Sequence, residues 1–63
     1  MNDNDNIRLK VNNLPVGYRD RKYIVFRMVE GAAWFYDCWD DIEKALQQAI
    51  EIGGQFVPSS RVE

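Results

Sequence analysis

The sequence predicts a small α+β domain in which an antiparallel sheet carries one amphipathic helix on one face, in the element order β-β-β-α-β. Three observations lead to this prediction. Residues 23–38 contain two β-rich runs separated by a two-residue turn. Residues 40–52 have helical apolar spacing and are followed by two glycines. A chain of 63 residues is long enough for one domain with a small core.

The helix is the most clearly specified element. Asp40 followed by Glu43 has the spacing of a capping box, in which two side chains satisfy free N–H groups of the first turn. We therefore predict that Asp40 is the N-cap and that the helix ends near Ile52. Gly53 can adopt the left-handed conformation that closes a helix, and Gly54 then lets the chain reverse. Apolar residues at helical spacing predict one buried stripe, made of Ile42, Ala45, Leu46, Ala49 and Ile50.

A β-hairpin precedes the helix. Residues 23–29 and 32–38 are rich in the β-branched and aromatic side chains that favour strands. Glu30-Gly31 lies between them and has the length of a two-residue hairpin loop. The two runs are therefore expected to pair in antiparallel fashion.

Counting outwards from that loop separates the hairpin into two faces, because side chains alternate along a strand. It pairs Phe26 with Phe35 and Val25 with Tyr36. The first face is almost wholly apolar and is the predicted seat of the helix, with Leu46, Ala49 and Ile50 against the two phenylalanines. Its members are Ile24, Phe26, Met28, Ala33 and Phe35. The second face carries Tyr23, Val25, Arg27, Trp34 and Tyr36.

Two further strands complete the predicted sheet. Residues 7–12 alternate apolar and polar side chains, and the basic ones suit an edge strand. Residues 55–57 form a last short strand, which Pro58 stops or marks as an edge. Because crossovers through a helix are right-handed, this strand should lie beside residues 23–29 and run antiparallel to them. The predicted domain spans residues 7–58.

The remaining composition bounds the class of protein. Residues 1–6 are expected to be a disordered arm and residues 59–63 a polar tail. The chain has no histidine, and Cys38 is its one cysteine, so an intramolecular disulfide and the usual zinc sites are excluded. A lone thiol suits a reducing compartment, and the apolar runs are too short to span a membrane. We therefore expect a soluble cytoplasmic protein with no membrane contact.

No catalytic, cofactor-binding or metal-binding residue is predicted. Four acids could act in general acid–base catalysis, but their place at a helix start favours capping; they are Asp37, Asp40, Asp41 and Glu43. They also lack the spacing of a calcium loop. Cys38 has no histidine partner and no second cysteine nearby, which favours a small buried apolar residue over a nucleophile. The chain is therefore not expected to be an enzyme.

The charges are unevenly distributed along the chain. The net charge is −2, but residues 7–29 sum to +5 and residues 30–63 to −5. Such asymmetry can mark a contact with an acidic partner, or it can only keep two surfaces solvated. The basic residues that could make the contact are Arg8, Lys10, Arg21 and Lys22.

Several short motifs of the chain resemble a pattern in small uncharacterised proteins of bacterial and phage genomes. The motifs are Tyr23-Ile24-Val25, Glu30-Gly31, Trp34-Phe35-Tyr36, Asp40-Asp41, Glu43-Lys44-Ala45 and Ile52-Gly53-Gly54. The succession of hairpin, acidic-capped helix and final strand is also similar to that of the small phage inhibitor of host RNA polymerase. The resemblance implies the fold and not an activity, and no functional residue is carried over from it.

The second face of the hairpin is the predicted partner-binding site, because one helix covers only one side of a small sheet. Tyr23, Arg27, Trp34 and Tyr36 are of the types that dominate interfaces, and Arg27 could lie over Trp34. The first hypothesis is a protein-binding module, such as a phage or mobile-element modulator of a host protein. The alternative is that the segment with Leu14, Val16 and Tyr18 covers this face internally.

Two other functions stay open at this point. A single-stranded nucleic-acid binder would stack bases on Tyr23, Trp34 and Tyr36 while the basic residues between 8 and 27 meet phosphates. The isoelectric point near 5.0 argues against a polyanion as partner. The third hypothesis is a self-associating domain, such as a homodimer, with no other ligand.

Overall fold

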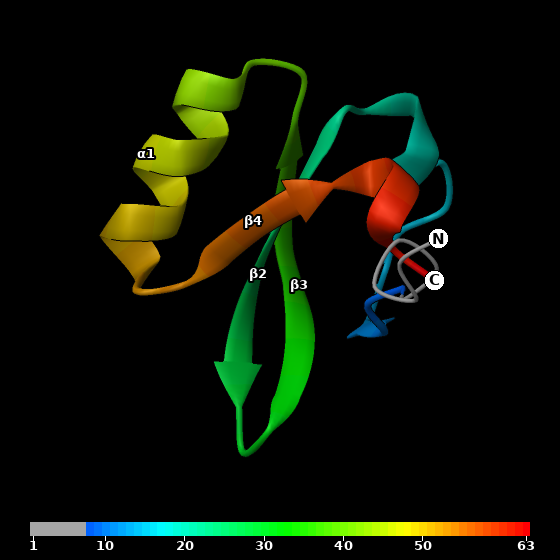
Figure 1. The fold of residues 1–63 in the computed structure, drawn as a ribbon, viewed down its shortest axis with the longest axis vertical. Coiled ribbons are helices and arrows are strands. Elements are labelled where there is room, and N and C mark those ends of the chain that lie inside the picture. The colour runs from blue at the N-terminus through cyan, green and yellow to red at the C-terminus, as the bar shows by residue number, and fades with distance from the viewer. Residues whose placement is uncertain (1–7) are drawn as a thin grey trace, which may run out of the picture.

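The computed structural model describes residues 8–63, so the arm expected at residues 1–6 lies outside it (Figure 1). Its strands and helix are β1 (Val11–Asn12), β2 (Tyr23–Val29), β3 (Ala32–Trp39), α1 (Ile42–Ile52) and β4 (Gln55–Pro58). Two short 3-10 helices, η2 (Tyr18–Asp20) and η3 (Ser59–Arg61), lie in the connections. The α+β class and the order β-β-β-α-β are confirmed.

The strands form one sheet in the order β1-β3-β2-β4. β2 is antiparallel to both of its neighbours, and β1 adds a short parallel pairing in which Val11 lies beside Ala33. The chain passes from β3 through α1 to β4 and so skips the position of β2. The predicted direction of the last strand and the edge position of the first are both confirmed.

The hairpin has the predicted turn and a bulge that was not predicted. Glu30 and Gly31 both have positive φ, 51° and 83°, as the favoured two-residue hairpin turn requires. The expected register holds up to the pairing of Phe26 with Phe35. Beyond it, Val25 pairs with Asp37, and Tyr36 is the extra residue of a β-bulge.

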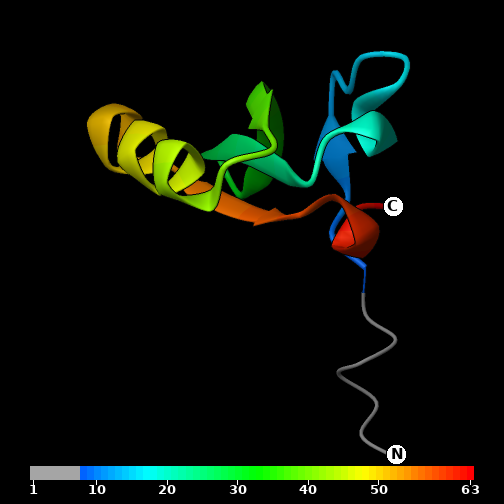
Figure 2. The same cartoon turned by 90° about the horizontal axis from the view of Figure 1, so that it is seen from above.

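The helix packs on the opposite sheet face from the predicted one, so the expected contacts of Leu46 and Ile50 with Phe26 and Phe35 are wrong. Val25, Ala45 and Ala49 form the buried centre of the helix side. Four half-buried side chains surround it, namely Tyr23, Trp39, Ile52 and Phe56. Figure 2 shows α1 on one side of the sheet and the segments near both chain ends on the other.

Those terminal segments cover the face that was assigned to the helix. Its buried residues are Val11, Ile24, Phe26, Ala33 and Val62. Residues 59–63 are therefore not the expected polar tail, since Val62 is completely buried. Leu9 N–H donates to the Arg61 carbonyl and Glu63 N–H donates to the Leu9 carbonyl, both at 2.8 Å. The two ends of the described chain are thus paired over one half of the core.

The helix begins one residue later than predicted. Asp41, not Asp40, is the N-cap, and its Oδ1 accepts the Glu43 N–H at 2.9 Å. At the other end, the backbone of Gly53 is left-handed with φ 66°, as expected. A side chain on Gly54 would overlap the carbonyl oxygen of Phe26, so this residue is fixed by a close approach of two backbones.

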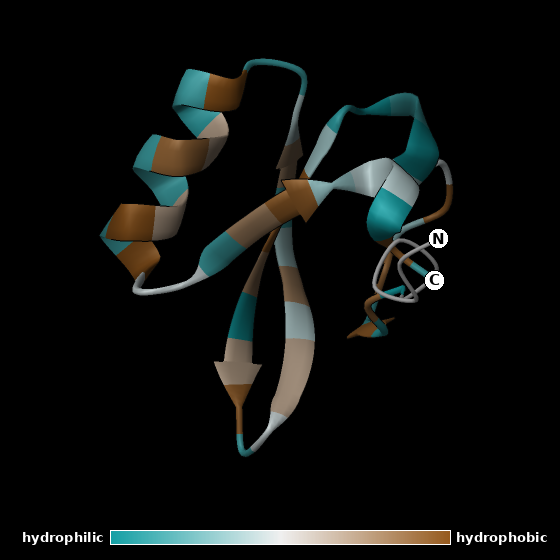
Figure 3. Ribbon diagram, viewed as in Figure 1, coloured by the Kyte–Doolittle hydropathy of each residue, from teal (hydrophilic) through white to brown (hydrophobic). Residues whose placement is uncertain are grey.

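Three of the five residues in the apolar stripe of α1 are exposed, which contradicts the expectation that all of it is buried. Ala45 and Ala49 face the sheet, but Ile42, Leu46 and Ile50 are 50%, 48% and 72% exposed. In Figure 3 hydrophobic residues recur along the whole helix. The small alanines let α1 lie close over the sheet, so the larger residues beside them stay at its flank.

Candidate partner-binding surface

The hairpin extends beyond the end of the helix, and its outer part leaves one sheet face open (Figure 1). Arg27 and Trp34 are directly opposite each other on β2 and β3. Both lie on the helix side, because Arg27 is two residues after Val25 along a regular strand. Trp34 is 46% exposed and Tyr36 49%. We call Arg27, Trp34 and Tyr36 the hairpin patch.

Tyr23, the fourth predicted site residue, is not part of this patch. It lies at the other end of β2, where its ring meets that of Phe56 edge to face, with centroids 6.0 Å apart. Tyr23 is half-buried and belongs to the core under α1. The structure therefore brings together three of the four predicted residues.

The predicted stacking of Arg27 on Trp34 is not found within residues 8–63. The cation–π contacts of that part of the chain are Arg19 on Tyr18, at 5.4 Å, and Lys44 on Trp39, at 5.7 Å. Arg27 is exposed and lies opposite Trp34 in the strand pairing, without a cation–π contact to it. Its charge is thus available to a partner.

The patch is not covered by the segment that follows β1. Leu14 and Tyr18 pack on the other face, with the core that contains Val62. Val16 contacts neither face and is fully exposed. The internal cover considered from the sequence is therefore absent from residues 8–63, and the hairpin patch faces solvent.

The β-bulge positions the last residue of the patch. Because Tyr36 is the unpaired extra residue, Asp37 takes the place opposite Val25. Asp37 then faces the helix, where its Oδ2 accepts from Gln48 Nε2 at 3.0 Å, and its Oδ1 accepts the Cys38 N–H at 2.8 Å. The bulge was not predicted, and the one local irregularity in this run is Asp37, a charged residue among aromatic and other apolar ones.

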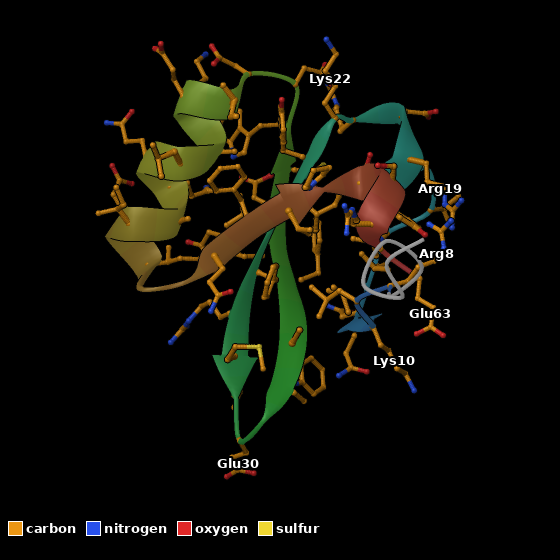
Figure 4. The ribbon with its side chains drawn as sticks, viewed as in Figure 1. Arg8, Lys10, Arg19, Lys22, Glu30 and Glu63 are labelled. Atoms are coloured by element: carbon orange, nitrogen blue, oxygen red, sulfur yellow. The ribbon has the colours of Figure 1, made fainter. Side chains whose placement is uncertain are left out.

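The basic residues predicted to make electrostatic contacts are scattered. Arg21 Nη1 lies 2.9 Å from Asp40 Oδ2, and Arg8 donates to the Ser60 carbonyl. Figure 4 shows Lys22 at one end of the molecule and Arg8 and Lys10 beside the terminal segments. Lys10 lines a shallow hollow of about 400 Å³ with Met28 and Ala33, behind the hairpin patch. These residues do not surround the exposed aromatic side chains.

The thiol of Cys38 has a raised pKa. Burial raises the pKa of its thiol, the nearby carboxylates of Asp37 and Asp40 raise it further, and Arg21 partly opposes them. A raised pKa keeps the thiol protonated at neutral pH, whereas a nucleophile needs the thiolate. Within residues 8–63, no three side chains of the metal-binding types come together.

No protein-family model, curated protein or solved structure matches this chain. Within residues 8–63, no helix is long and apolar enough to cross a membrane. A function for the hairpin patch therefore has to follow from its own geometry and chemistry.

Proposed function

We propose that this protein is a non-enzymatic protein-binding module whose hairpin patch contacts the partner. The observation that carries the proposal is the position of the patch. Two paired strands extend past the helix and hold a tryptophan and a tyrosine about half exposed, with an arginine beside them. Large aromatic side chains at the surface lose contact with water only when another molecule covers them.

The residue types of the patch support a protein as that molecule. Tryptophan, tyrosine and arginine are the residues most enriched in interface hot spots. β3 is held by strand pairing on both sides at Trp34, with Arg27 of β2 on one side and Asn12 of β1 on the other. A rigid scaffold lowers the entropy that binding must overcome. The partner surface would offer an apolar pocket for Trp34 and a carboxylate for Arg27.

The single cysteine of the chain suits a reducing compartment, which supports the cytoplasm as the place where this contact is made. A nucleic acid is the weaker candidate, because the basic residues other than Arg27 that would meet phosphates lie apart from the hairpin patch. We therefore infer a modulator that works by occupying a surface of another protein.

Replacement of Trp34 by alanine tests this proposal. The protein and its Trp34→Ala variant would be immobilised and exposed to a host lysate, and any captured protein would be purified and titrated by calorimetry. We expect the affinity of the variant to fall by about 2 kcal/mol, roughly 30-fold, because a hot-spot aromatic is removed. Circular dichroism should show an unchanged fold.

Met28→Ala is the matched control. Met28 is 49% exposed, like Trp34, but lies on the other face of the same hairpin. The Met28→Ala variant should bind the partner with the affinity of the unmodified protein. Equal affinities for the Trp34→Ala and Met28→Ala variants, both folded, would exclude the hairpin patch as the binding site.

A further inference from the structure

A second apolar surface lies on α1, away from the hairpin patch. Ile42, Leu46 and Ile50 follow one another at intervals of one helical turn and are all at least 48% exposed. We call these three residues the helix stripe. A row of aliphatic side chains this exposed is unusual for a surface helix, whose outer face is normally polar.

Hydrogen bonds to β3 show which way the stripe faces. Gln48 accepts from Trp39 Nε1 at 2.7 Å and donates to Asp37, so its flank of the helix faces β3. Residues advance by about 100° along a helix, which places Leu46 and Gln48 on opposite sides of the sheet-facing Ala45. The helix stripe therefore lies on the flank above β4, the last strand of the sheet.

β4 presents an open edge directly below that flank. Within residues 8–63 its one strand neighbour is β2. Ser59 N–H donates to the Lys22 carbonyl, and alternation along an antiparallel ladder then turns the backbone groups of Phe56 away from β2. The same alternation turns the ring nitrogen of Pro58 away from β2, so its lack of an N–H removes no hydrogen bond between β4 and β2. Phe56 thus offers one N–H and one C=O to a further strand.

We propose that the helix stripe and the β4 edge together form the interface of a homodimer. The two β4 strands pair in antiparallel fashion about a twofold axis at Phe56, so that the sheets of both copies become continuous. α1 lies over β2 and contacts β4 on one flank and β3 on the other. The twofold axis turns the β4 flanks of the two helices, and with them the two helix stripes, toward each other across the joined edges.

The stripe has the symmetry that a second copy requires. Leu46 is its centre, with Ile42 one turn before and Ile50 one turn after. A twofold axis at Leu46 packs it on its own counterpart and packs Ile42 of each copy on Ile50 of the other, as an isologous interface demands. The stripe and the edge lie on neighbouring parts of the molecule, because Phe56 of β4 packs in the same cluster as Ala45 and Ala49 of α1.

Two charged residues of α1, Lys44 and Glu51, lie on the flank opposite the helix stripe. Lys44 contacts the Trp39 ring on the flank that faces β3, and Glu51 lies on the same side as Lys44. Both are therefore turned away from the second copy. The hairpin patch stays free in the dimer, so the homodimer does not depend on the proposed function and would present two patches to partners.

Sedimentation equilibrium tests the dimer directly. We expect the unmodified protein to sediment at twice the mass of its 7.4 kDa chain at micromolar concentration. Leu46→Glu and Ile50→Glu should shift it to the monomer, with unchanged circular dichroism. Ile50 is exposed enough that its replacement does not disturb the core. Gln47→Glu introduces the same charge on the solvent side and should leave the dimer intact.

Cross-linking tests the orientation of the two copies. In a Cys38→Ser background, Leu46→Cys should form a disulfide-linked dimer under mild oxidation, because the two Leu46 positions meet at the axis. Trp34→Cys in the same background is the control and should not cross-link. A monomeric unmodified protein, a folded Ile50→Glu variant that still dimerises, or equal cross-linking at both positions would each overturn the proposal.

Discussion

At the scale of single residues, two adjacent carboxylates have separate structural roles. Asp41 caps α1 by accepting the Glu43 N–H. Asp40 joins the helix start to the beginning of β2, because it pairs with Arg21 and accepts the Lys22 N–H at 3.2 Å. Both side chains are exposed. A helix cap that satisfies a backbone N–H contributes more stability than an exposed ion pair.

Asp41→Ala should therefore lower the free energy of unfolding by about 1 kcal/mol, within the range measured for lost N-caps. Asp40→Ala should cost less, since it removes an exposed ion pair, which contributes roughly 0 to 1 kcal/mol, and one long, exposed hydrogen bond from the Lys22 N–H. Urea denaturation measures both, and amide hydrogen exchange separates the causes. The Glu43 amide should lose protection in Asp41→Ala alone; its loss in Asp40→Ala instead would return the cap to Asp40.

The sequence could predict the helix and its acidic start, but not which aspartate caps it. Asp40 and Asp41 are both suitable capping residues, and Asp40 has Glu43 at the favourable spacing. The choice depends on Arg21 and Lys22, which are about 20 positions earlier and come close only in the folded chain. Local spacing contains no information about such a distant partner.

At the scale of elements, Gln48 fixes how α1 lies on the sheet. It accepts from the Trp39 indole and donates to Asp37, so it contacts β3 through two polar groups at once. These bonds hold one flank of the helix against the sheet. They also turn Ile42, Leu46 and Ile50 toward the β4 side, which links the orientation of the helix to the proposed dimer.

Gln48→Glu should disturb this junction. The new carboxylate can still accept the hydrogen bond from Trp39. It has no N–H to donate to Asp37, and places a carboxylate oxygen there instead. We expect a loss of about 1 to 3 kcal/mol in the free energy of unfolding, the cost of an unsatisfied and repelled polar contact. Gln47→Glu adds the same charge at an exposed position and should be nearly silent in the same urea titration. Equal effects would mean that charge alone, and not the contact, matters.

The exchange of the two sheet faces also belongs to this scale. Strand alternation correctly separated Ile24 and Phe26 from Val25 and Arg27, but alternation does not say which face a helix covers. Gln48 is outside the predicted apolar stripe because it is polar, although it lies against the sheet and accepts a hydrogen bond from Trp39. Arg27 and Trp34 remain in the exposed patch, because they lie beyond the end of α1. Tyr23 is not in the patch, because it lies beneath the helix.

At the scale of the whole molecule, the two ends of the described chain close the core opposite the helix. The parallel bridge between Leu9 and Val62 joins segments more than 50 positions apart. Ser59 adds a partly buried hydrogen bond, which its hydroxyl donates to the Arg21 carbonyl at 2.6 Å. No local signal in the sequence predicts this closure, because Ser59–Arg61 is polar and Val62 is a single apolar residue in a polar segment.

Val62→Ala tests whether that closure is part of the fold. Val62 is fully buried beside Ile24 and Phe26, so its truncation should lower the free energy of unfolding by about 2 kcal/mol through lost burial and a residual cavity. Domains of this size have only about 3 to 9 kcal/mol in total, at roughly 0.05 to 0.15 kcal/mol per residue. Val16→Ala is the matched control, because Val16 is fully exposed and its truncation should change nothing. If urea denaturation finds the two variants equally stable, the last residues of the chain do not belong to the core.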